Sequence, residues 1–169
     1  AERVWEAIRD QRTVGVLRED PALKVWDVGV PVGVIAAIVP STNPTSTVCY
    51  KAMIALKAGC AIVFSPHPAA AKCTRRSVEI VAQAAEAAGC PRGAVSCLQT
   101  PTMEAVDELM KCPPVRLIMA TGGPGMVKAA YSSGKPAIGV GAGNGPAYIH
   151  KSADIPKAVA DIIRSKTFD

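Results

Sequence analysis

The sequence predicts an α/β fold with a doubly wound, mostly parallel sheet and an N-terminal β-hairpin. Three observations lead to this prediction. Residues 32–39 form an unbroken run of small or branched apolar residues, which is typical of a central strand covered by helices on both faces. Short apolar runs alternate with helical stretches after this strand, which favours right-handed crossovers. Gly59 and Gly89 end two of the helical stretches, as C-cap residues do.

The first elements come from local patterns near the N-terminus. Residues 2–10 are expected to form a short helix, because their apolar side chains share one side. Two strands, at 13–17 and 23–30, are expected to be joined by a turn at Asp20 and Pro21. This pair is the predicted hairpin.

The later elements follow the central strand. A helix at 45–57 is expected because Ser, Thr, Asn and Pro directly before it supply an N-cap and a first-turn proline. A turn at 121–125 leads into a helix that ends at 130. The same alternation of apolar runs and helical periodicity predicts strands at 61–64, 95–98, 116–119, 137–140 and 147–150 and helices at 70–88, 103–110 and 155–164.

Composition limits the classes of function. The 169 residues are 49% hydrophobic but only 4% aromatic, which predicts a core of Ala, Val and Ile. The net charge of +5 is spread as single lysines and arginines without the aromatic-interleaved stripe of a nucleic-acid surface, so we expect no nucleic-acid partner. The excess favours an anionic ligand such as a nucleotide or coenzyme A. No signal peptide or membrane-spanning run is visible, which predicts a cytoplasmic protein. The six cysteines lack metal-ligand spacing, so we expect buried reduced thiols and no metal site.

Two strand-to-helix turns are candidate ligand sites. Ser41, Thr42 and Asn43 follow the central strand, at the kind of edge where open α/β sheets bind ligands. The plain alternative is that these residues only cap the next helix. The turn at 121–125 is rich in glycine and opens a helix, so its backbone N–H groups are expected to face an anion. Its plain alternative is an ordinary glycine turn.

Four segments together carry a family resemblance: PVGVIAAIVPSTNPTS, AIVFSPHP, ATGGPGMVKAA and IGVGAGNGPAYI. They resemble the aldehyde dehydrogenase superfamily. More narrowly, they resemble its CoA-acylating branch, the acetaldehyde and propionaldehyde dehydrogenases of bacterial microcompartments and of bifunctional alcohol/aldehyde dehydrogenases. The resemblance implies a Rossmann-like NAD(P)/CoA-binding domain at 31–169 and an oligomerisation hairpin at 13–30, which the expected N-terminal helical segment at 1–12 precedes.

The resemblance also implies a reaction. A cysteine thiolate attacks a short-chain aldehyde, hydride passes to NAD or NADP, and coenzyme A takes the acyl group from the resulting thioester. In relatives the nucleophilic cysteine follows a segment like Lys166-Thr167-Phe168-Asp169, and none of the six cysteines of this chain stands there. We therefore expect a cofactor-domain fragment that lacks the catalytic cysteine domain and is inactive alone.

Site residues follow from the resemblance. Thr42 and Asn43 are the expected oxyanion donors, with the choice between them open. Ser65 and Pro68 stand where hydrolytic relatives carry a ribose-binding lysine and glutamate, so the sequence is compatible with NADP as well as NAD. The expected cofactor-binding residues are Val39, Pro40, Ser41, Ser65, Pro66, His67, Pro68, Thr100, Thr121, Gly122, Gly123, Met126, Gly139, Val140 and Gly141.

One missing residue bears on the choice of acyl acceptor. Gly139 occupies the position of the glutamate that activates water in hydrolytic relatives, and residues 139–146 contain no carboxylate. A thiol needs less help than water, because a few per cent of it is already thiolate at neutral pH. The sequence therefore favours acyl transfer to coenzyme A. A glycine-rich hairpin of purely structural use is the alternative.

The expected partners are a short-chain aldehyde, coenzyme A and further copies of the chain, which would pair through the hairpin. A bacterial microcompartment shell is a further expectation from the resemblance. Two other functions stay open at this point: a non-catalytic nucleotide- or CoA-binding module, and an assembly element. A gene that stopped after Asp169 would favour the binding module.

Overall fold

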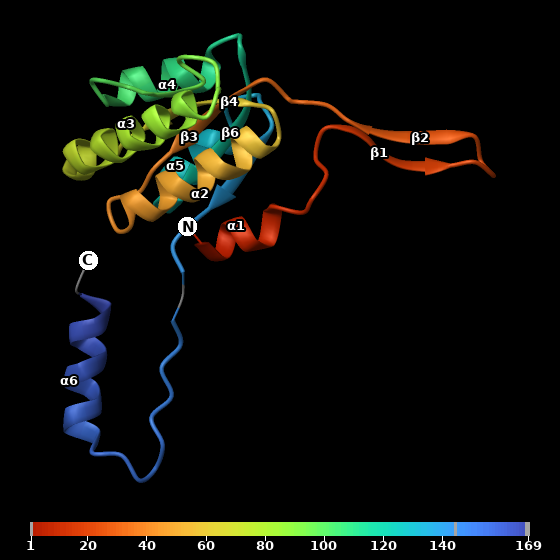
Figure 1. Cartoon of the computed structure of the whole chain (residues 1–169). Helices are drawn as coiled ribbons and strands as arrows, with labels where there is room; N and C mark the ends of the chain where they lie inside the picture. Colours follow the sequence, from red (N-terminus) through yellow and green to blue (C-terminus); the bar gives the residue numbers. More distant parts are fainter. Residues whose placement is uncertain (1, 144, 168–169) are drawn as a thin grey trace.

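The computed structural model describes residues 2–143 and 145–167. Five strands pair in parallel in the order β5–β4–β3–β6–β7 (Figure 1). Their bounds are β3 Val34–Ile38, β4 Ala61–Ser65, β5 Val95–Cys97, β6 Val115–Thr121 and β7 Ala137–Val140. The predicted α/β class and parallel sheet are confirmed.

Helices cover both faces of the sheet. Their bounds are α2 Pro44–Lys57, α3 Ala71–Ala87, α4 Met103–Lys111 and α5 Pro124–Tyr131, with a 3₁₀ turn, η1 Pro68–Ala70, before α3. Val48 of α2 and Val78 of α3 pack in one buried cluster, whereas Val106 of α4 and Ala130 of α5 pack in the other. The sheet is therefore the middle layer of three.

The central strand explains this layering. Successive side chains of a strand point to opposite faces, so Ala37 joins the cluster under α2 and α3 while Ala36 joins the cluster under α4 and α5. Both side chains are fully buried. The chain runs from β3 outward to β5 and then returns to β6 on the other side of β3, so the strand order reverses between β3 and β6. Open α/β sheets bind ligands at the carboxyl edge of such a reversal.

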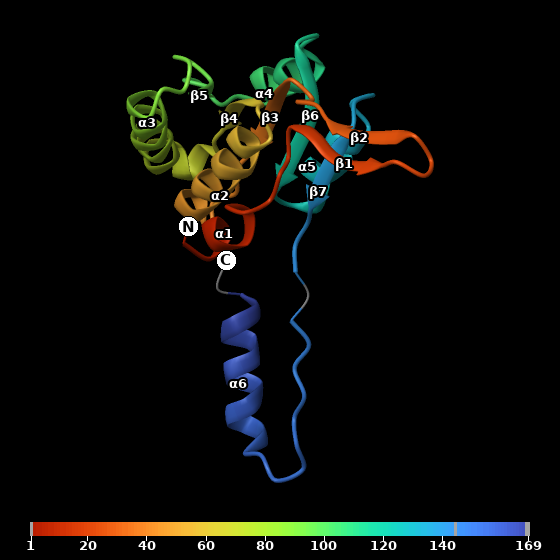
Figure 2. The ribbon, with the colours of Figure 1, turned by 45° about the vertical axis from the view of Figure 1, so that its right-hand side comes forward.

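The hairpin stands out from the sheet (Figures 1 and 2). Strand β1 (Gly15–Asp20) pairs antiparallel with β2 (Val25–Gly29), and helix α1 (Glu2–Ile8) lies against α2. The Asp20 carboxylate accepts a hydrogen bond of 3.0 Å from the Leu23 N–H, and Lys24 takes a positive φ of 53°. The turn therefore consists of the four residues after Asp20. Strand β1 begins and ends later than the expected 13–17, and β2 is shorter than the expected 23–30.

The C-terminal part departs from prediction. Beyond β7 the chain leaves the sheet in an extended path and ends in helix α6 (Ile155–Lys166), which lies apart from the sheet (Figures 1 and 2). The strand expected at 147–150 is wrong, because these residues are exposed and irregular. An apolar run forms a strand only where another strand offers backbone hydrogen bonds, and no described strand lies beside this one.

The expectations about the cysteines and the helix ends have different outcomes. All six cysteines are free thiols, but only Cys60 is buried and Cys73 is exposed, so the expectation of uniformly buried thiols is wrong. Among the described residues, no helix combines the length and the apolarity that a bilayer crossing requires. The predicted helix ends at Gly59 and Gly89 are confirmed by positive φ angles of 69° and 92° directly after the last helical turns.

Candidate functional site

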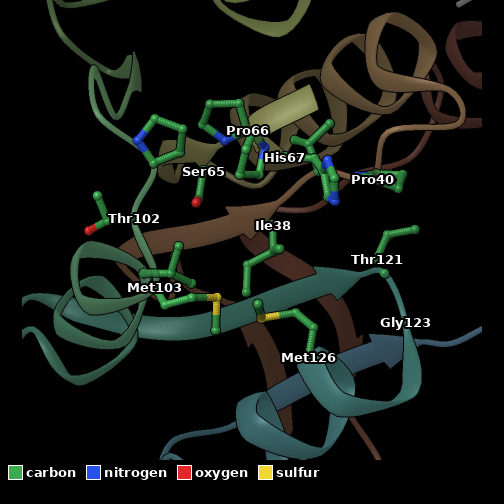
Figure 3. A pocket seen from close by; sticks show the side chains of 15 residues that line it. Ile38, Pro40, Ser65, Pro66, His67, Thr102, Met103, Thr121, Gly123 and Met126 are labelled. Carbon is green, nitrogen blue, oxygen red and sulfur yellow. The ribbon is translucent and has the colours of Figure 1, made fainter. Parts of the chain in front are cut away.

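A pocket of about 490 Å³ opens at the carboxyl edge of the sheet, where β3, β4 and β6 end. It lies at the point where the strand order reverses. Figure 3 shows Pro66 and His67 on one side of it and Met103 and Met126 on the other, with Ile38 between. The pocket is lined by Ile38, Val39, Pro40, Ser65, Pro66, His67, Pro68, Pro101, Thr102, Met103, Val106, Thr121, Gly122, Gly123 and Met126.

Ten residues of the predicted cofactor set come together in this pocket. They are Val39, Pro40, Ser65, Pro66, His67, Pro68, Thr121, Gly122, Gly123 and Met126. They come from the ends of β3, β4 and β6 and from the segments that follow these strands, including the first turn of α5. No Asp, Glu, Lys or Arg lines the pocket, so the site is apolar with a few hydroxyl, imidazole and backbone polar groups. This is the usual make-up of a small-molecule site.

The loop after β4 is held by local hydrogen bonds. His67 is the N-cap of η1, and its Nδ1 accepts a hydrogen bond of 3.2 Å from the Ala69 N–H. With Nδ1 acting as an acceptor, the neutral ring carries its proton on Nε2 and can donate it to a ligand. The Ser65 carbonyl accepts from the Val39 N–H at 3.0 Å, which joins the ends of β3 and β4. Ring and backbone are thus preorganised at the rim.

The glycine loop after β6 is only partly available to a ligand. The Gly122 N–H donates to the Val140 carbonyl at 3.1 Å, so the expectation that this N–H faces an anion is wrong. Gly123 is the N-cap of α5 and lines the pocket. No protein atom lies within 4 Å of the position that a Cβ would take on Gly123. A ligand can therefore approach the backbone closely at this residue.

One side of the pocket, formed by the start of α4, was not predicted from the sequence. Pro101, Thr102, Met103 and Val106, at the start of α4, line the pocket together with Ile38. Thr102 caps α4 by accepting a 3.1 Å hydrogen bond from the Ala105 N–H. A threonine between a strand and a helix is the same kind of signal that marked the turn after β3, and applied here it would have found this wall.

The expected oxyanion donors lie outside this pocket, as does Ser41. They are on the exposed loop that leads into α2. Asn43 takes the N-cap position before Pro44, but its side chain does not cap the backbone. Its Oδ1 instead accepts hydrogen bonds from the hydroxyls of Thr42 (3.4 Å) and Thr47 (3.3 Å). Their catalytic role stays a prediction.

The remaining predicted residues, Thr100, Gly139, Val140 and Gly141, also lie outside the pocket lining. Thr100 is separated from it in the chain only by Pro101. The Gly139 N–H donates to the Tyr131 hydroxyl at 3.0 Å. Any contact of these four with a cofactor stays a prediction.

A buried lysine beneath the pocket escaped the sequence analysis. Lys51 of α2 is 1% exposed, and its Nζ donates to the carbonyls of Ile38 (2.8 Å) and Met119 (2.8 Å). Burial lowers the pKa of Lys51 from 10.5 to about 7, because the charged form loses its water. The side chain ties the carboxyl ends of β3 and β6 together and so fixes the floor of the site. Only a structure reveals that this helical lysine points inward.

Comparisons with known proteins identify the family of this chain. A family model described as "Aldehyde dehydrogenase family" matches residues 5–169. The bifunctional aldehyde-alcohol dehydrogenase AdhE of Escherichia coli (strain K12) is 52% identical over all 169 residues, which span 19% of that relative. An acetylating aldehyde dehydrogenase from Geobacillus thermoglucosidasius is 61% identical with a TM-score of 0.84, over 98% of this chain and 36% of that one. A propionaldehyde dehydrogenase of Rhodopseudomonas palustris, with bound CoA and an acylated cysteine, is 44% identical with a TM-score of 0.68, over 80% of this chain and 31% of that one.

Proposed function

Because this chain belongs to the aldehyde dehydrogenase family, we propose that it forms the nucleotide-binding part of a CoA-acylating aldehyde dehydrogenase. The reaction would oxidise a short-chain aldehyde to its acyl-CoA with reduction of NAD or NADP. The chain spans well under two thirds of the relatives it matches, so the rest of the machinery lies outside it. The observation that carries the proposal is the pocket at the strand-order reversal, which gathers ten of the predicted cofactor residues.

The pocket has the chemistry that an adenosine needs. Met103 and Met126 offer apolar, polarisable surface for a flat base, and both side chains enter the pocket from helices on the same face of the sheet (Figure 3). Gly123 lets a pyrophosphate approach the backbone at the start of α5. Because no carboxylate lines the pocket, a phosphorylated ribose meets no like charge. NADP is therefore compatible with the site, as NAD is.

The choice of coenzyme A rather than water follows from what the chain offers as a base. Residues 139–143 carry no carboxylate to activate water, whereas a thiol is partly ionised without help. The bound nicotinamide would accept the hydride, and the nucleophilic cysteine would come from outside this chain. The chain's own part is to bind the nucleotides and to supply the hydrogen-bond donor that stabilises the oxyanion. For the latter we propose Thr42 or Asn43, at the start of α2.

A matched glycine pair tests the nucleotide site. Gly123→Ala and Gly125→Ala both place a methyl where no protein atom lies within 4 Å, so both variants are expected to fold. Only Gly123 lines the pocket. We expect Gly123→Ala to weaken NAD binding to the 169-residue chain about tenfold, measured by titration calorimetry, and Gly125→Ala to leave it within about twofold. Equal binding by all three proteins would contradict the placement of the nucleotide.

The activity is tested on the protein that carries this chain together with the remainder of the enzyme. We expect CoA-dependent NAD(P) reduction with acetaldehyde or propionaldehyde. Nucleotide binding without any turnover in that protein would instead support a non-catalytic binding module. Assembly through the hairpin, a cytoplasmic location and association with a bacterial microcompartment are further parts of the proposal, and they rest on the family resemblance.

A further inference from the structure

The five methionines of the chain differ in how far solvent reaches them. Met110 and Met119 belong to the two buried clusters and are 3% and 9% exposed. Met103, the first residue of α4, is 66% exposed, and Met126 of α5 is half-buried. Both of these line the main pocket, and their side chains enter it from α4 and α5 (Figure 3). Met53 is half-buried and lies outside the pocket lining.

A thioether on the wall of an open pocket is within reach of small oxidants. The pocket of about 490 Å³ that we assign to a nucleotide admits a hydroperoxide, which is far smaller, whereas packing closes off Met110 and Met119. The sulfur attacks one peroxide oxygen, the O–O bond breaks, and the proton of the transferred hydroxyl passes to the departing hydroxide. Methionine sulfoxide and water result, so the sulfur is oxidised and the peroxide is reduced by the same electron pair.

We propose that Met103 and Met126 form an oxidation site at which conversion to methionine sulfoxide weakens nucleotide binding. The inference rests on the proposed function, because these two side chains offer the surface on which the base would lie. Methionine sulfoxide is reduced back to methionine by dedicated thiol-dependent reductases. Nucleotide binding by this chain would therefore follow the redox state of its surroundings.

The make-up of the pocket explains why the modification matters there. Among the described residues, those that line it include no Asp, Glu, Lys or Arg, and Ile38 and Val106 lie on the same side as the two methionines. A sulfoxide oxygen accepts hydrogen bonds, so covering it with a flat base costs the water that it would otherwise bind. Met126 also packs against the buried cluster beneath α4 and α5. We therefore expect Met103 to be oxidised first and Met126 more slowly.

The first measurement maps the oxidation in the 169-residue chain. Its thiols are blocked reversibly with methyl methanethiosulfonate before hydrogen peroxide is added, because free cysteines are oxidised too. Dithiothreitol then frees the thiols and leaves the sulfoxides in place. Peptide mass spectrometry should find Met103 oxidised at least about tenfold faster than Met110 and Met119. Saturating NAD should slow the oxidation of Met103 and Met126 but not that of Met53.

The second measurement relates the modification to binding. NAD is titrated calorimetrically before and after peroxide treatment, and the ratio of the two affinities is taken within each variant. We expect oxidation to weaken binding about tenfold in the unsubstituted chain. The double variant Met103→Leu, Met126→Leu removes both sulfurs at nearly equal volume and should bring the ratio to about one. Met53→Leu is the matched control outside the pocket and should keep the tenfold loss.

Repair provides a readout that needs no substitution. Oxidised chain is treated with a mixture of the two methionine sulfoxide reductases, one for each sulfoxide epimer, and titrated again. The affinity for NAD should return to that of untreated chain. A loss that survives complete reduction of both sulfoxides would overturn the inference.

The outcomes separate two failures. Unchanged NAD affinity after oxidation of both pocket methionines, or a loss that the double variant shares, would overturn this inference while leaving the nucleotide pocket intact. Oxidation of Met110 and Met119 as fast as Met103, or a loss that Met53→Leu removes, would also overturn it. Absence of NAD binding by the untreated chain would overturn the proposed function, and this inference with it.

Discussion

Two regions of the molecule treat their apolar side chains differently. One is the sheet with its four covering helices, and the other consists of the hairpin and α6, which project from it. In the sheet, Ile62 and Phe64 are fully buried among residues of the same chain. In the hairpin, Trp26 is 66% exposed, and helix α6 contains no buried residue although Ile155, Val159 and Ile163 recur at helical spacing along it. The sheet domain carries its own core, whereas the hairpin and α6 display apolar side chains to water.

This difference separates what the chain stabilises by itself from what it offers to other parts. Exposed apolar side chains that gather on one element are typical of an interaction site. The proposed nucleotide pocket belongs to the self-sufficient region, because every wall of it comes from a strand end, loop or helix that packs in the sheet domain. The proposed binding and the proposed assembly therefore depend on different regions of this chain, and four substitutions test that separation.

The largest effect is expected from the core. Phe64→Ala removes a fully buried ring from the cluster beneath α2 and α3, and should lower the free energy of unfolding by about 3–5 kcal/mol. Urea titration followed by circular dichroism measures it. A loss below about 1 kcal/mol would contradict the description of the sheet as the stabilising region.

The second effect comes from the buried lysine and depends on pH. Lys51 has a pKa of about 7 in the folded chain, below its ordinary 10.5, so between these values the unfolded chain binds more protons. The free energy of unfolding should therefore rise with pH across this window, by up to about 1.4 kcal/mol per pH unit, and Lys51→Met should flatten the rise. Urea titrations from about pH 7 to about pH 9.5 test it. Lys128→Met, a change of an exposed lysine, should keep the slope of the unsubstituted chain.

A smaller effect is expected at the edge of the sheet. A Cβ on Gly139 would lie 2.6 Å from Val127 Cγ1 and 2.8 Å from Tyr131 Cε2, and Tyr131 also accepts the Gly139 hydrogen bond. Gly139→Ala should therefore cost about 1–3 kcal/mol of stability. Gly141→Ala meets no atom within 4 Å and should be near neutral. If thermal unfolding finds the two variants equal, the packing of α5 on β7 differs from that described.

The smallest effect on the free energy of unfolding is expected in the hairpin. The same substitution tests whether the hairpin forms the proposed interface between copies. Trp26→Ser should change the free energy of unfolding of the sheet domain by less than about 0.5 kcal/mol, because the side chain lies mostly in solvent. If the hairpin pairs copies of the chain, the same variant should lower the mass measured by light scattering. An unchanged oligomer would remove the hairpin from the proposed interface.

The sequence predicts the sheet domain well because its signals are local and agree with one another. The run at 32–39 needs cover on both faces whatever surrounds it, and the glycines at 59 and 89 end their helices through their own backbone freedom. The strand expected at 147–150 fails because a strand depends on a neighbour that local pattern does not reveal. The inward direction of Lys51 and the hydrogen bond of Gly122 escape for the same reason: both depend on partners distant in the chain.

One hydrogen bond connects the loop after β6 with the start of the segment that leads to α6. The Gly122 N–H is held by the Val140 carbonyl, at the last residue of β7, where the chain leaves the sheet toward α6. The loop that faces the pocket and the root of the departing segment are thus anchored to each other. A force that pulls on the extended segment therefore reaches the loop after β6 through this amide contact and the β6–β7 pairing next to it, and whatever steadies that loop also steadies the point of departure.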